Sequence, residues 1–392
     1  MADPVHTVFD AGRGNQPCTH VLCIGVGRYR HLPGGDGPLA EDPLGLKQLA
    51  SPPVSVKAFA DWFLRPLLGQ PEGFSNPLAP LGTLRCLASA GEPLAIQGPQ
   101  GRVQVDTATK ANIAVGFAAW LSDLKSNPAN VGVFYFCGHG LMVSDHYLLA
   151  EDFGEGMQPW LNAFDISSTI RAVEREVKGA LFFFIDACRQ VSRELSLSVG
   201  AAPQALRSPA LARPVLRSSL TGISATGEGQ LAFAPPGGKV SRFTAALLRA
   251  LSGYAGIKMA GQDFWDVDGE TLASATRKLL EQDTGLDGVA AQYSEQTIHG
   301  RSVPLMRLTA PPKVAIKIDY LPADKRQRYE LYVKSFGLHV KQTREDKRFE
   351  AVIPMGIYAI GAVDPDGGLP SDERQHEDIR PPVYEIQLGG TL

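Results

Sequence analysis

The sequence contains few cysteines, and their spacing argues against a metal or disulfide scaffold. None of the five forms a Cys-x-x-Cys pair, and none is spaced with histidines as zinc ligands are. Cys23, Cys86 and Cys137 lie within apolar runs, where a cysteine usually behaves as a small buried hydrophobe. We therefore expect neither a zinc site nor a disulfide framework.

Long hydrophobic runs and an excess of positive charge are also missing. No stretch reaches the roughly 18 uninterrupted apolar residues of a membrane span, and the N-terminus has no basic region followed by an apolar core. The net charge of -3 argues against nucleic-acid or membrane binding through a generally basic surface. We expect a cytoplasmic protein without nucleic-acid or membrane partners.

What the sequence does contain is two apolar, aromatic runs, at 131–137 and 180–187. Each is typical of a strand buried on both faces of a parallel sheet. The first is followed by His139 and the second by Cys188, which are 49 residues apart (188 minus 139), enough for one crossover and its loops. Because parallel strands place their carboxyl ends side by side, these two side chains are expected to meet.

The segments around these runs alternate between strand and helix patterns, and residues 1–18 have the composition of a loose arm. Strands are expected at 21–26, 84–88, 131–137, 147–150, 180–187, 220–225 and 303–308, and helices at 54–67, 109–124, 165–177, 241–251 and 270–280. The alternation favours an α/β fold over residues 19–310, a three-layer sandwich with a mostly parallel sheet.

Two regions depart from this pattern. Residues 191–217 are rich in Ser, Ala, Pro and Arg with little apolar periodicity, which is typical of an exposed linker. Beyond Pro311-Pro312, several segments alternate at period two and are separated by turns rich in Pro, Asp and Gly. We expect a small antiparallel β-sandwich domain over 313–392. The chain length of 392 residues is sufficient for two domains.

The side chains at the two strand ends suit nucleophilic catalysis. Cys188 can act as the nucleophile and His139 as its base, and a thiol needs no third member to be activated. The glycines on either side of His139 free the backbone to approach a ligand, so the amides of Gly140 and Cys188 are candidate oxyanion donors. No Asn or Asp can be assigned as a third catalytic residue.

Three motifs resemble those of one peptidase family. Phe136-Cys-Gly-His-Gly140, Asp186-Ala-Cys-Arg189 and the segment from Ile223 to Phe233 are similar to the caspase-like (clan CD, peptidase C14) cysteine peptidases, and most of all to the bacterial caspase homologues called orthocaspases. The resemblance covers roughly residues 20 to 308. It implies a cysteine endopeptidase acting on protein substrates, with His139 and Cys188 catalytic and Gly140 donating to the oxyanion.

The resemblance also bears on specificity through the residue two before the cysteine. Animal caspases carry Gln there and cleave after Asp, whereas metacaspases and paracaspases carry Asp and cleave after Arg or Lys; here it is Asp186. A carboxylate at the base of the substrate-binding (S1) pocket would pair with arginine and repel an acidic side chain. A second pocket carboxylate is expected among four candidates that the sequence leaves open: Asp42, Asp145, Asp152 and Glu228.

In caspase-like proteins the linker after the nucleophile strand is often cut during activation. Here it carries Arg193, Arg207, Arg213 and Arg217, so activation by self-cleavage or by an upstream peptidase is expected. The linker lacks the acidic clusters of calcium-dependent metacaspases, so we expect no metal and no cofactor. Bacterial relatives often act in defence or regulated death.

Two alternatives remain from the sequence. A catalytically silent caspase-like scaffold would work by binding alone, although both dyad residues are present. A different α/β hydrolase is disfavoured, because Cys188 lies in Asp-Ala-Cys-Arg-Gln and not in a Gly-x-Ser/Cys-x-Gly elbow.

Overall fold

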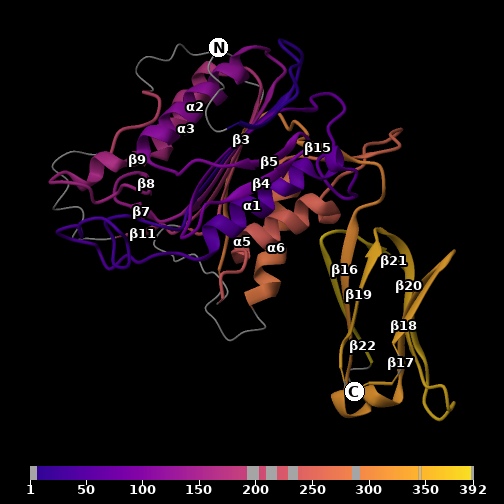
Figure 1. Cartoon of the computed structure of the whole chain (residues 1–392). Coiled ribbons are helices and arrows are strands. Elements are labelled where there is room, and N and C mark those ends of the chain that lie inside the picture. The colour runs from indigo at the N-terminus through magenta and orange to yellow at the C-terminus, as the bar shows by residue number, and fades with distance from the viewer. Residues whose placement is uncertain are drawn as a thin grey trace.

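The computed structural model describes residues 7–191, 203–208, 219–227, 237–284, 292–342, 344–345 and 347–389, and its elements are drawn in Figure 1. A seven-stranded sheet forms its centre, in the order β1-β3-β2-β6-β10-β12-β14. The inner five strands run parallel, while β1 and β14 pair antiparallel at the two edges. The strands are β1 (Thr7–Asp10), β2 (Thr19–Val26), β3 (Leu81–Ser89), β6 (Val131–Gly138), β10 (Ala180–Ala187), β12 (Ser219–Ser224) and β14 (Glu295–Gly300).

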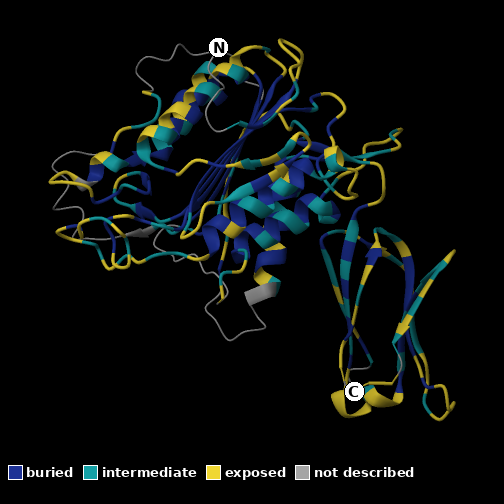
Figure 2. Ribbon diagram, in the orientation of Figure 1, coloured by how far each residue is buried: buried dark blue, intermediate teal, exposed yellow. Residues whose placement is uncertain are grey.

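Helices cover both faces of this sheet, which is the predicted three-layer α/β architecture. Strand residues alternate between the faces: Tyr135 and Phe184 pack towards α1, α5 and α6, whereas Phe134 and Phe183 pack towards α2 and α3. The sheet interior is buried throughout (Figure 2). The helices are α1 (Ser51–Leu64), α2 (Lys110–Lys125), α3 (Ile166–Glu176), α5 (Arg242–Arg249) and α6 (Gly269–Thr284).

The predicted helix starts agree with the capping chemistry. The side chain of Thr109 accepts from the amide of Asn112 at the start of α2, and that of Asp165 accepts from the amide of Ser168 at the start of α3. Between β3 and α2, the segment 89–105 contains a hairpin formed by β4 (Ala95–Gly98) and β5 (Gly101–Gln104).

Two sequence-based expectations at the sheet edges are wrong. Residues 7–10 of the expected loose arm form β1 on β3, and residues 1–6 lie outside the described part. The segment 303–308 does not close the main sheet: β15 (Met306–Leu308) pairs with β13 (Trp265–Val267) in a separate ribbon. The edge strand is β14, whose mostly exposed polar residues conceal the strand pattern.

A second, four-stranded sheet follows the loops that carry His139 and Cys188, in the order β11-β7-β8-β9. Its strands are β7 (Gly140–Met142), β8 (His146–Leu149), β9 (Ala163–Asp165) and β11 (Gln190–Val191). β7 begins directly after His139, and β11 begins two residues after Cys188 and pairs with β7 in parallel. This accessory sheet therefore joins the two strand ends that carry the candidate dyad.

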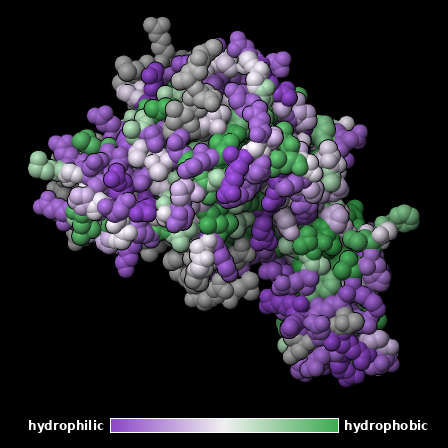
Figure 3. Space-filling view, viewed as in Figure 1, coloured by the Kyte–Doolittle hydropathy of each residue, from purple (hydrophilic) through white to green (hydrophobic). Residues whose placement is uncertain are grey.

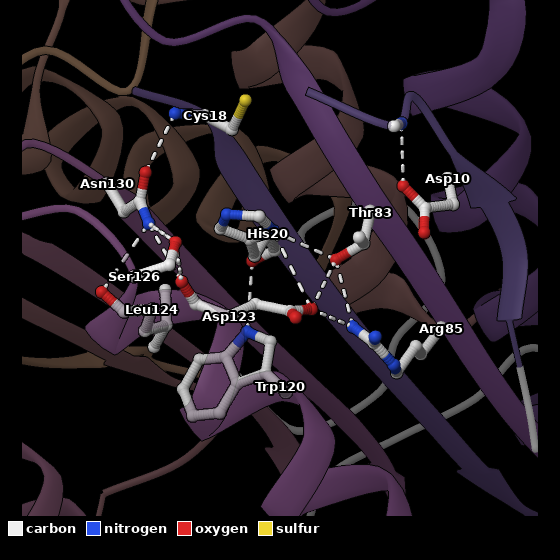
Figure 4. A network of polar contacts seen from close by, with 11 residues as sticks. Asp10, Cys18, His20, Thr83, Arg85, Trp120, Asp123, Leu124, Ser126 and Asn130 are labelled. Atoms are coloured by element: carbon white, nitrogen blue, oxygen red, sulfur yellow. Dashed lines mark hydrogen bonds and ion pairs between the residues drawn. The ribbon is translucent and has the colours of Figure 1, made fainter. Parts of the chain in front are cut away.

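The opposite end of the main sheet, where the parallel strands begin, holds a buried polar network (Figure 4). Arg85 pairs with Asp123 on α2 and donates to the Thr83 hydroxyl, which in turn lies 2.9 Å from Nδ1 of His20. Asn130 accepts from the Cys18 amide. These bonds fasten α2 to β2 and β3 at the end of the sheet remote from the candidate site.

The predicted linker is not exposed throughout. Within 203–208, Pro203 is buried, the carbonyl of Gln204 accepts from the Asp165 amide, and the Leu206 amide donates to the hydroxyl of Thr169. Arg207 pairs with Glu176. This segment is therefore docked on α3, while residues 192–202 and 209–218 lie outside the described part.

The C-terminal strands form a β-sandwich with its own core, as predicted. One sheet has the order β19-β16-β22 and the other β18-β17-β20-β21. We expected a purely antiparallel sandwich, and this is wrong in one respect, because β16 and β22 pair in parallel. The strands are β16 (Lys313–Tyr320), β17 (Glu330–Ser335), β18 (Leu338–Gln342), β19 (Phe349–Pro354), β20 (Gly356–Val363), β21 (Asp372–Ile379) and β22 (Val383–Leu388).

Candidate active site

The pairing register of the central strands brings His139 and Cys188 together. β6 and β10 pair in parallel with Cys137 opposite Asp186 and Gly138 opposite Ala187. His139 is the next residue after Gly138, and Cys188 is the next residue after Ala187. Both therefore leave the sheet at adjacent positions, at the carboxyl end where open α/β sheets bind their ligands.

One ring nitrogen of His139 is hydrogen-bonded to the backbone of the segment before α1. Its Nε2 donates to the carbonyl oxygen of Lys47 at 2.7 Å. A carbonyl only accepts, so the proton lies on Nε2 and the lone pair on Nδ1 is left as the base. Burial is the largest influence on the ring and lowers the pKa of His139, while the Lys47 carbonyl raises it. The imidazole is therefore neutral at about pH 7 and able to accept a proton.

Tyr29 supports the backbone of the His139 loop. It follows β2, which lies beside β6, and its hydroxyl accepts from the His139 amide at 2.7 Å. The two rings also contact, with centroids 4.9 Å apart. Gln48 fixes Tyr29 in turn, because its side chain accepts from the Tyr29 amide and donates to the Tyr29 carbonyl. The single segment between β2 and α1 thus holds both the imidazole ring and the backbone of His139.

Cys188 differs from the other cysteines in its exposure. It is half-buried, whereas the remaining cysteines are all buried, as the apolar runs around three of them predict. Its neighbour Arg189 pairs with Glu295, the first residue of the edge strand β14. Cys188 is therefore partly exposed at the end of β10, and the residue after it is anchored to the edge strand of the sheet.

The glycines around His139 are required by close packing within the site itself. A methyl group on Gly140 would lie 2.6 Å from the Cys188 carbonyl oxygen, and one on Gly138 would lie 3.0 Å from the Tyr29 hydroxyl. The Leu149 amide donates to the carbonyl of His139, so Gly140 occupies a non-hydrogen-bonded position of the β7–β8 pair. The Gly140 amide is thus not spent on β8.

Asp186 lies near the carboxyl end of β10, beneath the surface. It is 4% exposed. Its Oδ2 accepts from the hydroxyls of Ser241 and Thr244 at the start of α5 and from the thiol of Cys137. Burial is the largest influence and raises the pKa of Asp186, while these three donors lower it. The carboxylate also anchors the first turn of α5 through these donors.

The candidates for a second pocket carboxylate lie in varied places. Asp42 is exposed and caps its own turn by accepting from the Leu44 amide. Asp145 pairs with Arg171 on α3, and Asp152 accepts from the Lys110 amide on the α2 side of the sheet. Glu228 lies outside the described residues. None of the three described carboxylates is bonded to the residues around Asp186.

Three residues of the site escape the sequence-based reading: Tyr29, Lys47 and His146. The Nε2 of His146 donates to the Cys188 carbonyl at 3.1 Å. The position of Tyr29, three residues after a buried strand, could have indicated from the sequence that it lies at the carboxyl end of the sheet. Lys47 contributes only a backbone carbonyl, which leaves no mark in the sequence, and His146 depends on the hairpin that returns it to the nucleophile.

Among the described residues, no cluster of three or more His, Cys, Asp or Glu side chains is arranged to hold a metal ion. No helix in the same part of the chain is long and apolar enough to cross a membrane.

The fold and site together define a three-layer α/β protein with a Cys and a His on adjacent strand ends. A family model described as the caspase domain matches residues 59–298. The uncharacterised protein y4kE of Sinorhizobium fredii is 35% identical over 300 residues, which cover 73% of this chain and 85% of that protein. The chain belongs to the caspase-domain family, peptidase C14.

Solved structures of caspases are also similar to this chain. Caspase-1 from Spodoptera frugiperda is 14% identical with a TM-score of 0.39, covering 78% of this chain and 96% of its own. The structure of pro-sf-caspase-1 is 12% identical with a TM-score of 0.40, covering 77% of this chain and 98% of its own.

Proposed function

We propose that this protein is a cysteine endopeptidase that cleaves protein substrates with Cys188 as nucleophile and His139 as general base. The observation that carries the proposal is the β6–β10 register, which brings the two residues to adjacent positions, with Nε2 of His139 committed to the Lys47 carbonyl. The catalytic nitrogen is then Nδ1. Family membership supports the same chemistry.

In the proposed mechanism, Nδ1 of His139 takes the thiol proton as the Cys188 sulfur attacks the scissile carbonyl carbon. The negative oxygen that forms is stabilised by the amides of Gly140 and Cys188. The imidazolium then gives its proton to the departing amine as the C–N bond breaks, leaving a thioester. Water, deprotonated by His139, cleaves the thioester to a carboxylic acid and restores the thiol.

The preference that best fits the site is for Arg, then Lys, before the scissile bond. Asp186 is a carboxylate two residues before the nucleophile, at the carboxyl end of β10. Its three donors are a thiol and two hydroxyls, so no basic side chain among them cancels its charge. A substrate guanidinium would supply the missing cation.

Activation by cleavage in the 191–217 linker is part of the proposal, and the docked segment refines it. Arg207 is paired with Glu176, and the backbone beside it is bonded to Thr169. A peptidase needs an extended, accessible strand of substrate, so Arg207 is a poor cleavage site. Cleavage is expected at Arg193, Arg213 or Arg217, either by the protein itself or by an upstream peptidase.

The test compares wild type with Cys188→Ala on fluorogenic peptides ending in Arg, Lys or Asp, with the chain's integrity followed on a gel. Cleavage after Arg by wild type only is the expected result. The isosteric Asp186→Asn should lose most of the preference for Arg, whereas Ser241→Ala removes one donor, keeps the charge and should retain it. Equal cleavage by wild type and Cys188→Ala would overturn the mechanism, and a preference for Asp would overturn the role of Asp186.

The alternative function is a silent caspase-like scaffold. It predicts that wild type cleaves none of the peptides while still presenting a normal, alkylatable Cys188. The placement of His139 and Cys188 after adjacent strand ends, as a catalytic dyad requires, favours the enzyme.

A further inference from the structure

His146 is a second histidine in the site with no part in the proposed mechanism. It opens β8 and is only 4% exposed. β8 returns antiparallel to β7, the strand that starts directly after His139, with His146 opposite Met142. A polar ring at such depth must be hydrogen-bonded, and its bonds show what it does.

The His146 ring touches both backbone segments that carry the proposed oxyanion donors. Nε2 donates to the Cys188 carbonyl at 3.1 Å. The same Nε2 would lie 2.7 Å from a methyl group built on Gly140, so the ring lies directly against that glycine. The Cys188 carbonyl in turn lies against Gly140. The His146 imidazole therefore fixes the spacing between the Gly140 segment and the Cys188 segment.

The ring stays neutral under ordinary conditions, which suits a donor to a carbonyl. Burial chiefly, and then the charge of Arg189, lower the pKa of His146 to about 4, while the bond to the Cys188 carbonyl raises it. Its backbone is held as well, since the His146 amide donates to the hydroxyl of Ser167 on α3. The imidazole is thus a fixed, uncharged donor.

We propose that His146 is a positioning residue of the peptidase, which holds the Cys188 carbonyl against Gly140 so that the Gly140 and Cys188 amides converge on one oxyanion. The inference rests on the proposed function. Donors must be fixed before the reaction to stabilise the developing charge, and a loose pair gives up much of that stabilisation. The effect belongs to the transition state, so it appears in kcat and not in KM.

The test compares His146→Leu with His146→Gln, whose amide can still donate to the carbonyl. His146→Leu should lower kcat about 10- to 100-fold with KM within about twofold, and His146→Gln should recover most of the loss. A peptide aldehyde ending in Arg forms an oxyanion on Cys188, so its affinity should fall by the same factor. Alkylation by iodoacetamide, which forms no oxyanion, should change less than about twofold.

Three outcomes would overturn the inference. Unchanged kcat in His146→Leu would do so, as would equal losses in both variants, because packing alone then explains the effect. Alkylation falling in parallel with kcat would likewise show a general disturbance of the thiol. Absence of Cys188-dependent cleavage in wild type would instead overturn the proposed function, and this inference with it.

Discussion

Close backbone contacts decide the chemistry at the scale of single residues. The Cys188 carbonyl approaches Gly140 so closely that no side chain fits there. A methyl group built on Gly222 in β12, by contrast, would have its nearest neighbouring atom at 3.7 Å, which is an ordinary contact. Gly140→Ala should therefore lower kcat/KM at least about 100-fold, because the methyl group displaces one proposed oxyanion donor. Gly222→Ala is the matched control and should keep activity. Full activity in Gly140→Ala would contradict the packing account.

Tyr29 offers a second test at this scale. Tyr29→Phe keeps the ring against His139 but removes the hydroxyl that accepts from its amide. The loss of one buried hydrogen bond should lower kcat/KM about 5- to 10-fold. Steady-state kinetics with the preferred peptide give the value, and thermal unfolding checks that the fold is intact. An unchanged rate would show that the loop holds His139 without this bond.

The sequence predicts some of these residues and not others. His139 and Cys188 can be found because each ends an apolar run, and parallel pairing does the rest. The glycines beside His139 are recognisable too, and the structure adds a packing reason for them: they lie against Tyr29 and Cys188. Lys47 and His146 reach the site through loop and hairpin geometry, which local sequence does not encode.

At the scale of elements, the buried strands were predictable and the edges were not. β2, β6 and β10 are buried along their whole length, so their composition is distinctive. β14 is an exposed edge strand of polar residues, while 303–308 alternates like a strand but pairs elsewhere. Periodicity reports burial, and an edge strand lacks it.

The network of Figure 4 carries a prediction about stability. Arg85 on β3 is 4% exposed and pairs with Asp123 on α2. The hydroxyl of Thr83, also on β3, donates to the same carboxylate. Arg85→Leu leaves that carboxylate without its cation and should lower the free energy of unfolding by about 2 to 4 kcal/mol. Urea unfolding measures it, with the exposed Arg102→Leu as control. Equal stability would show that Asp123 is satisfied by solvent.

The same network makes stability depend on pH. Burial chiefly lowers the pKa of His20 below its usual 6.5, although Asp123 raises it. Below about pH 6.5 the unfolded chain therefore binds a proton that the folded chain does not, and the free energy of unfolding falls. Between about pH 7.5 and about pH 5.5, His20→Gln should lose about 1 kcal/mol less than wild type. His139 and His146, whose pKa values are also lowered, account for a remaining fall. Equal pH dependence in the two proteins would contradict this.

At the scale of the whole molecule, the β-sandwich has a core of its own. Its described polar contacts with the rest of the chain include the Lys313–Glu72 ion pair and a bond from Gln282 to Glu385. Figure 3 shows hydrophobic surface at the end of the sandwich nearer the peptidase domain and hydrophilic surface at its far end. The sandwich therefore has the separate core that a domain of its own requires.

A shortened chain tests this division. Residues 1–311 should fold and cleave the preferred peptide with kcat/KM within about threefold of the full chain, because the site is built from elements before β16. Loss of cooperative unfolding in the shortened protein would contradict the boundary at Pro311-Pro312.

The central claim is that Cys188, activated by His139, attacks peptide carbonyl groups. Its most direct test is covalent labelling with a peptidyl acyloxymethyl ketone ending in Arg, with the modified residue located by mass spectrometry. One label per chain on Cys188 is predicted, absent in Cys188→Ala and at least about 100-fold slower in His139→Ala. Labelling of another residue, or an unchanged rate in His139→Ala, would contradict the account.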